Sequence, residues 1–296
     1  MNFSGKIRHV ARQRTVPSAR CIVPEQLQSK HMIWTDHGQT KRKFNKMNTQ
    51  LSKTAVLVAL ITILISCNQG TKTRENEGTP ATKEEPPIIT HVMTKEAQAK
   101  LMPDEVLKEF KEGNQRFNSG TKTLRDHSEQ IRKSAEGQFP KAVVISCLDS
   151  RVPVEDVFDQ GIGDIFVGRV AGNFINEDLL GSIEFACKVA GAKLVFILGH
   201  QHCGAVKGAI DDVQLGNMTA MLSKIKPAVA MSQDFQGEKT SKNDAFVKYV
   251  SENNVRLAIK QIRERSPILK EMEDKGKIKI VGAYYNLTDG TLEFVE

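Results

Sequence analysis

A surplus of charge of one sign is missing from most of this chain. The 296 residues carry a formal net charge of +7, but residues 1–46 alone hold 10 lysines and arginines against 2 acidic residues. The rest of the chain therefore has 32 basic and 33 acidic side chains. Because a nucleic-acid-binding protein needs a basic surface on its folded part, this balance argues against that class of function.

Cysteine is scarce and irregularly spaced. The five residues are Cys21, Cys67, Cys147, Cys187 and Cys203. An odd number at uneven intervals does not fit the disulfide framework of a small secreted domain. Cys187 lies in an apolar helical stretch and is expected to be a buried, inert thiol, whereas the motifs described below contain Cys67, Cys147 and Cys203.

The apolar run at residues 55–65 is too short to span a membrane and has about the length of a signal-peptide core. It leads into Leu64-Ile65-Ser66-Cys67, which resembles the bacterial lipobox, the motif whose cysteine is lipidated. We therefore expect residues 47–67 to be a lipoprotein signal peptide with Cys67 as the lipidation site, and residues 1–46 to be an upstream extension. A short buried helix and an uncleaved membrane anchor are the alternatives.

A polar stretch follows the lipobox. Residues 68–95, with Glu84, Glu85, Pro86 and Pro87 in them, have the composition of a flexible tether. The globular domain is then expected at residues 96–296. This layout predicts an exported protein that is lipid-anchored to a bacterial membrane, on its periplasmic side.

Short apolar runs alternate with amphipathic helical patterns in the globular part. The predicted strands cover residues 142–146, 165–167, 193–198, 277–284 and 291–295. A helix is predicted from Pro103, with breaks at Gly113 and Gly120, and further helices cover residues 128–137, 178–190, 205–211, 218–231 and 245–264. This alternation predicts an α/β fold with a mostly parallel central sheet flanked by helices, in which ligands bind at the carboxyl ends of strands.

Zinc ligands stand at two of these strand ends. Cys147 follows the first strand, and His200 and Cys203 follow the third. Thiolate and imidazole are the ligands that zinc prefers, and three of them leave a fourth position for water. A buried cysteine and a surface histidine would explain either piece alone, but the two pieces together favour a zinc site.

Asp149 and Arg151 add a feature that a purely structural zinc site does not need. The Asp149 carboxylate can itself bind the metal, or the Arg151 guanidinium can hold it away and leave that position to water. An ordinary salt bridge at the end of a strand is the alternative.

These residues resemble the signature of the β-class carbonic anhydrases, Cys-x-Asp-Ser-Arg followed by Gly-His-x-x-Cys-Gly. The resemblance extends from about Glu105 to the C-terminus, roughly two thirds of the chain. It includes the segments Gly113-Asn114-Gln115-Arg116-Phe117, Arg169-Val170-Ala171-Gly172-Asn173 and Gly181-Ser182-Ile183-Glu184-Phe185-Ala186.

The resemblance implies one zinc ion per subunit, bound by Cys147, His200 and Cys203. It implies that Asp149 forms a dyad with Arg151 and accepts a hydrogen bond from zinc-bound hydroxide. From the charge of the two thiolates we also predict that Asp149 binds the metal when the pH falls. The expected substrate-binding residues are Gln138, Phe166, Ala171, Phe185 and Gly204. At two positions the chain departs from the family, which often has tyrosine at position 185 and, in some bacterial members with an inhibitory bicarbonate site, tryptophan at position 144.

The expected function is therefore the reversible, zinc-dependent hydration of carbon dioxide to bicarbonate, with activity that rises toward alkaline pH because thiolate charge opposes ionisation of the water. Family members form homodimers or higher even oligomers, so Gln138 and the phenylalanines could serve a neighbour's zinc. His202 is a candidate proton shuttle or a histidine turned away from the metal. The alternative functions are a hydrolase of carbonyl sulfide or carbon disulfide, and a non-catalytic zinc-binding lipoprotein.

Overall fold

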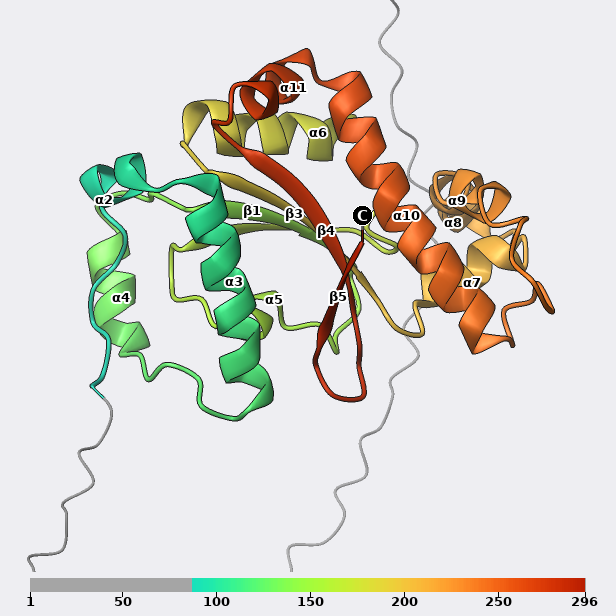
Figure 1. Cartoon of the computed structure of the whole chain (residues 1–296), viewed down its shortest axis with the longest axis horizontal. Coiled ribbons are helices and arrows are strands. Elements are labelled where there is room, and N and C mark those ends of the chain that lie inside the picture. Colours follow the sequence, from blue (N-terminus) through green and yellow to red (C-terminus); the bar gives the residue numbers. More distant parts are fainter. Residues whose placement is uncertain (1–86, 296) are drawn as a thin grey trace, which may run out of the picture. The chain divides into compact units, whose positions relative to one another are not determined.

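A five-stranded sheet is the centre of residues 87–295, the part of the chain that the computed structural model describes (Figure 1). The strand order is β2-β1-β3-β4-β5. The first four strands are parallel and β5 is antiparallel to β4. The strands are β1 (Ala142–Ser146), β2 (Ile165–Arg169), β3 (Leu194–His200), β4 (Lys279–Tyr285) and β5 (Leu292–Val295). The predicted α/β fold with a mostly parallel sheet is confirmed.

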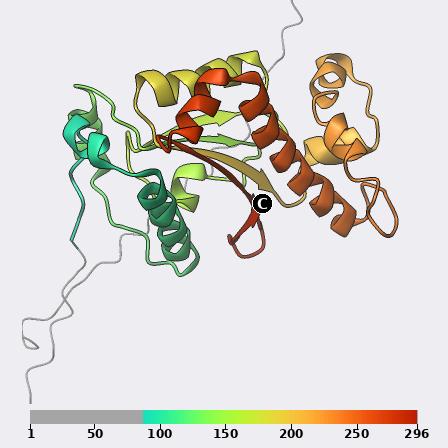
Figure 2. The same cartoon turned by 45° about the horizontal axis from the view of Figure 1, so that its top comes forward.

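Helices cover both faces of the sheet. The helices in this part of the chain are α2 (Lys95–Lys100), α3 (Pro103–Asn118), α4 (His127–Ser134), α5 (Val154–Val157), α6 (Glu177–Glu184), α7 (Gly204–Ile210), α8 (Gly216–Leu222), α9 (Lys226–Ala230), α10 (Asp244–Arg265) and α11 (Pro267–Asp274), with a π-helix at Phe185–Val189. In Figures 1 and 2, α6, α10 and α11 lie on one face of the sheet and α3 and α5 on the other.

The apolar side chains of β1 explain this layering. Its burial is complete along the strand, as expected for a central parallel strand. Val143 and Ile145 point into the core under α6, α10 and α11. Ala142 and Val144 point into the opposite core, where α3 and α5 contribute Phe110 and further apolar side chains.

Two helix predictions were wrong. Gly113 does not break α3, which continues to Asn118. A Cβ atom at Gly113 would lie 2.0 Å from the carbonyl oxygen of Phe158. The glycine therefore lets α3 approach the end of α5 closely. The single helix predicted at 218–231 is two short helices, α8 and α9, and Pro227 lies in the first turn of α9, where proline favours a helix start.

The first described residues pack on the domain. Ile89 forms a bridge with Arg125, and its N–H donates to the carbonyl oxygen of Leu124 at 2.8 Å. Within residues 87–295 no helix combines the length and the hydropathy needed to cross a bilayer. The upstream extension, the signal peptide with Cys67 and most of the predicted tether lie outside the described residues.

Candidate metal centre

The sheet brings the two predicted ligand loops together. Strands β1 and β3 are neighbours, with Ser146 paired with Leu198, so both strands end at the same edge. Cys147 follows β1 directly and His200 is the last residue of β3. Cys203 comes after a tight turn and directly precedes α7. His202 accommodates that turn with a left-handed backbone, at φ +54°.

The three side chains converge on one point. The sulfur atoms of Cys147 and Cys203 are 3.9 Å apart, and one ligand atom from each of Cys147, His200 and Cys203 lies within 4.8 Å of the others. All three residues are buried. A tetrahedral zinc ion with Zn–S bonds of about 2.3 Å separates two sulfur ligands by about 3.8 Å. The spacing observed for the sulfur atoms fits such an ion.

The His200 ring presents the correct nitrogen. Its Nδ1 lies 2.8 Å from the carbonyl oxygen of Gln201, which can only accept a hydrogen bond, so Nδ1 carries the proton. In the neutral ring Nε2 then has a free lone pair. Nε2 is buried and has no hydrogen-bond partner among the described residues. A bound metal ion would satisfy it.

The surroundings of the Cys147 sulfur favour its thiolate form. The N–H of Gly172 donates a hydrogen bond to it at 3.3 Å. The contact with the Cys203 thiol lowers the pKa of Cys147, and the same contact, together with burial, raises the pKa of Cys203. The thiolate is the form of cysteine that binds a metal.

Arg151 holds the Asp149 carboxylate in a fixed position. Arg151 donates through its backbone N–H and Nε to Oδ1, each at 2.9 Å, and through Nη2 to Oδ2 at 2.7 Å. These hydrogen bonds hold the pKa of Asp149 far below its usual range, so the carboxylate stays ionised. Its Oδ2 lies 3.9 Å from Nε2 of His200, beside the three ligand atoms.

Arg169 organises the first ligand loop, a role that the sequence did not reveal. From the end of β2 its guanidinium donates to the main-chain carbonyl oxygens of Cys147 at 3.0 Å, Asp149 at 2.6 Å and Val152 at 3.0 Å. One side chain thus fixes the segment that carries a ligand and the dyad. The sequence shows only an arginine shortly after the predicted strand 165–167, in a segment that resembles the family, and the contacted carbonyls belong to the folded main chain.

The predicted substrate-binding residues form two groups. Ala171 precedes Gly172, and Gly204 follows Cys203, so both are adjacent to residues of the metal centre. Phe166 instead pairs with Val143, four residues before Cys147, which places it about 13 Å back along the sheet. Its ring lies 6.2 Å from that of Phe185, centroid to centroid.

Gln138 lies near the opposite edge of the sheet. The amide of Lys141 donates to the carbonyl oxygen of Asp164, which extends the pairing at the amino end of β1. Cys147 is six residues further along, about 20 Å from Lys141. Gln138 is exposed and precedes Lys141 by three residues, so it lies on the amino-terminal side of β1, whereas the metal ligand Cys147 follows the carboxyl end of that strand.

Two further residues have defined surroundings. The His202 ring contacts Asp244 at the start of α10, with 3.2 Å between Nδ1 and Oδ1. Cys187 is buried and free, and burial raises the pKa of its thiol to about 12. It is inert at neutral pH, as its sequence context predicted.

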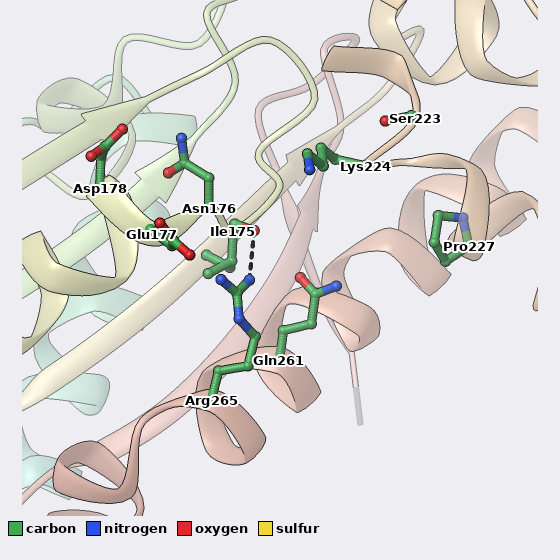
Figure 3. Close-up of a pocket in the computed structure, with 9 residues that line it drawn as sticks. All are labelled: Ile175, Asn176, Glu177, Asp178, Ser223, Lys224, Pro227, Gln261 and Arg265. Carbon is green, nitrogen blue, oxygen red and sulfur yellow. Dashed lines mark hydrogen bonds between the residues drawn. The ribbon is translucent and has the colours of Figure 1, made fainter. Parts of the chain in front are cut away.

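A separate cavity of about 550 Å³ lies between the start of α6, α8–α9 and the end of α10 (Figure 3). Lys224 and Arg265 border it together with Glu177 and Asp178, and Arg265 donates to the carbonyl oxygen of Ile175 at 3.2 Å. None of the predicted site residues lines this cavity. Among residues 87–295, the group of side chains that could hold a metal ion is Cys147, His200 and Cys203, at the carboxyl edge of the sheet.

Comparison with known proteins identifies the family. A sequence profile described as carbonic anhydrase matches residues 142–292, which include every residue of the metal centre. The chain belongs to the carbonic anhydrase family. Carbonic anhydrase 2 of Mycobacterium tuberculosis is 36% identical over 189 residues, which cover 62% of this chain and 88% of that protein. A carbonic anhydrase of Mycolicibacterium smegmatis is 34% identical over 192 residues, covering 63% and 90%.

Solved structures point to the β class. A β-carbonic anhydrase of the fungal pathogen Aspergillus fumigatus superimposes with a TM-score of 0.51 and 26% identity, covering 65% of this chain and 90% of that one. One of two β-carbonic anhydrases from Sordaria macrospora, described as tetrameric, has the same fold with a TM-score of 0.50 and 23% identity, covering 56% and 85%. The chain is a β-class carbonic anhydrase, and neither alternative function is favoured.

Proposed function

We propose that this chain catalyses the reversible hydration of carbon dioxide to bicarbonate and a proton, with one zinc ion per subunit bound by Cys147, His200 and Cys203. The observation that carries the proposal is the convergence of two sulfur atoms and an imidazole nitrogen that has no partner among residues 87–295, beside a carboxylate that an arginine holds aside. When bound, the ion lowers the pKa of a water molecule to about 7 and so supplies a nucleophile near neutral pH.

Asp149 has the geometry to orient that nucleophile. Its carboxylate is ionised and acts only as a hydrogen-bond acceptor, so an O–H beside Nε2 of His200 can donate to Oδ2. Donation to a fixed carboxylate directs the remaining lone pairs of the water oxygen away from Asp149 and toward the substrate. Arg151 keeps Asp149 in this position and away from the metal.

The substrate pocket is proposed to be shared between two subunits. Carbon dioxide is apolar, so it binds best to an apolar wall next to the nucleophile. Ala171 lies close to the metal centre of its own chain, whereas Phe166, Phe185 and Gln138 are displaced toward the other end of the sheet. A second copy of the chain would bring these three residues to the first copy's metal centre.

The edge strand β2 is the surface for that contact. The side chains of Ile165, Phe166 and Val167 in β2 are half-buried and that of Arg169 is exposed, although parallel strands are normally covered on both faces. Exposed apolar residues accompany it, among them Ile162, Phe185 and Val189. An apolar surface of this kind marks a subunit interface. We expect a homodimer or a higher even oligomer, which light scattering of the purified protein would detect.

The membrane anchor is also part of the proposal. Its support is the sequence around Cys67, where a short apolar run ends in a lipobox-like motif. Cleavage before Cys67 and its lipidation would place the enzyme on the periplasmic side of a bacterial membrane. Mass spectrometry of the mature N-terminus would find a lipidated Cys67, and an unmodified N-terminus at Met1 or Met47 would contradict the anchor.

The enzymatic proposal is tested by metal analysis together with a stopped-flow assay of carbon dioxide hydration. We expect one zinc ion per chain and a rate that rises between about pH 6 and 9, because two thiolates oppose ionisation of the water. Removing the zinc with a chelator should abolish the activity, and adding zinc back should restore it. A purified protein that is free of metal and inactive toward carbon dioxide would refute the proposal.

A further inference from the structure

Both polar groups of the Gly172 main chain are engaged in hydrogen bonds, on opposite sides of the residue. Its N–H donates to the sulfur of Cys147 at 3.3 Å. Its carbonyl oxygen accepts a hydrogen bond from Nδ2 of Asn254, at 2.7 Å. A side chain in the middle of α10 is thereby connected to a metal-ligand sulfur through one residue.

The turn at Gly172 is tightly constrained. Its φ is +86°, in the left-handed region that favours glycine. A Cβ atom at this position would lie 2.4 Å from Cδ1 of Ile225 and 3.1 Å from Cβ of Ala205. The missing side chain therefore allows this turn to pack closely against Ile225 and Ala205.

Asn254 is an unusual residue for its location. It is buried beneath the turn, and its Oδ1 has no hydrogen-bond partner within residues 87–295. A buried amide with an unused acceptor is unfavourable compared with an apolar side chain of similar size. The amide of Asn254 therefore acts through its donor, Nδ2, which donates to the carbonyl oxygen of Gly172.

We propose that Asn254 is a positioning residue of the metal centre, which holds the Gly172 N–H on the Cys147 sulfur and so limits the charge that this thiolate gives to a bound metal ion. A hydrogen bond to a ligand sulfur withdraws electron density from it and tunes the metal. The inference rests on the metal site of the proposed function. It adds a residue that lies 107 positions from Cys147 in the sequence and touches neither metal ligand nor substrate.

Cobalt(II) in place of zinc makes the proposal testable, because the sulfur-to-cobalt charge-transfer band reports directly on the electron density of the thiolates. In the Asn254→Ala protein we expect this band to move to longer wavelength, because the Cys147 thiolate regains electron density. We expect the metal dissociation constant to rise about tenfold, because the turn beside this ligand loses a positioning contact and this loss outweighs the stronger donation. Asn254→Asp, which keeps the shape but places an acceptor against the Gly172 carbonyl, should shift the band in the same direction.

Asn253→Ala is the matched control. Asn253 is the preceding residue of α10 and is also buried, but its Nδ2 donates to Oγ of Ser232 at 2.8 Å, away from the metal centre. This variant should lose thermal stability without moving the band. A band that is unchanged in both Asn254 variants, or equally shifted in Asn253→Ala, would overturn the role of Asn254. A parent protein that takes up no cobalt would instead refute the metal site itself.

Discussion

Asp149 and Asp159 are both held by arginine, and the comparison of their surroundings separates catalysis from stability. Asp149 receives its hydrogen bonds from a residue two positions away in the sequence, at the rim of the metal centre. Arginine lowers the pKa of its carboxyl group. On its other side lie Nε2 of His200, which has no partner in the described part of the chain, and the two ligand sulfurs.

The side chain of Asp159 has no solvent-accessible surface, and both of its carboxylate oxygens accept hydrogen bonds. Burial alone would raise the pKa of its carboxyl group, but hydrogen bonds from Arg125, Arg116 and Thr123 outweigh burial and lower that pKa to about 2. These partners come from residues 34 to 43 positions earlier, in α3 and in the segment before α4. The pairing of an aspartate with arginine therefore orients a catalytic group at Asp149, whereas at Asp159 it connects segments that are far apart in the sequence.

The strongest way to break this comparison is to remove the Asp149 carboxylate. In Asp149→Ala we expect kcat/KM for carbon dioxide hydration to fall about 1,000-fold, because the group that accepts the hydrogen bond from the attacking water is lost. Zinc content should stay at one ion per chain, since the three ligands remain. Stopped-flow kinetics and metal analysis check both. Asp156→Ala, at an exposed carboxylate paired with Lys122, is the control. Loss of zinc in Asp149→Ala would show that Asp149 is a ligand instead.

The opposite result is expected at Asp159. Asp159→Asn leaves two guanidinium groups without their anion, and we expect it to lower the free energy of unfolding by about 3 kcal/mol. The kcat of the folded fraction should be unchanged, because Asp159 does not contact the metal centre. Urea unfolding followed by circular dichroism measures the first quantity. A variant that folds as well as the parent but is inactive would reverse the assignment of roles.

Sequence patterns were sufficient to predict those elements that a few consecutive residues determine. The burial of β1 follows from five consecutive residues, and its predicted limits, 142–146, are those observed. His200 was expected just beyond its strand and is in fact its last residue, which leaves the convergence with Cys147 unchanged. Thiolate and imidazole at adjacent strand ends are a strong signal because few other functions need them there.

The remainder depends on groups that only folding creates. The contacts of Arg169 are made to main-chain carbonyls, and the donor to the Cys147 sulfur is a main-chain N–H of Gly172. The residue types alone do not show which main-chain groups these contacts reach. Likewise, the separation of Phe166 from the metal centre follows from the direction of β2 in the sheet, since the sequence alone does not give distances.

Arg169 sharpens the comparison, because it is an arginine near Asp149 that holds main chain instead of a carboxylate. Arg169→Lys keeps the charge but cannot reach three carbonyl oxygens at once. We expect kcat/KM to fall about tenfold, since the loop with Cys147 and Asp149 loses its fixed geometry. Arg132→Lys, at an exposed arginine of α4, is the control and should be neutral. Equal kinetics in the two variants would exclude a role for the Arg169 clamp.

The smallest effect is the pH dependence of stability that Asp159 contributes. Its pKa is about 2 in the folded protein against an ordinary value of 3.8, so the unfolded chain binds more protons as the pH falls. The stabilisation is present above pH 3.8 and is lost as the pH falls through about 2, and between pH 5 and 3 it should decrease by about 1 kcal/mol. Unfolding experiments on the parent and on Asp159→Asn at several pH values isolate the contribution of Asp159 to the free energy of unfolding, because both proteins contain all the other carboxylates. Parallel pH profiles for the two proteins would show that the three hydrogen-bond donors do not stabilise the ionised carboxylate.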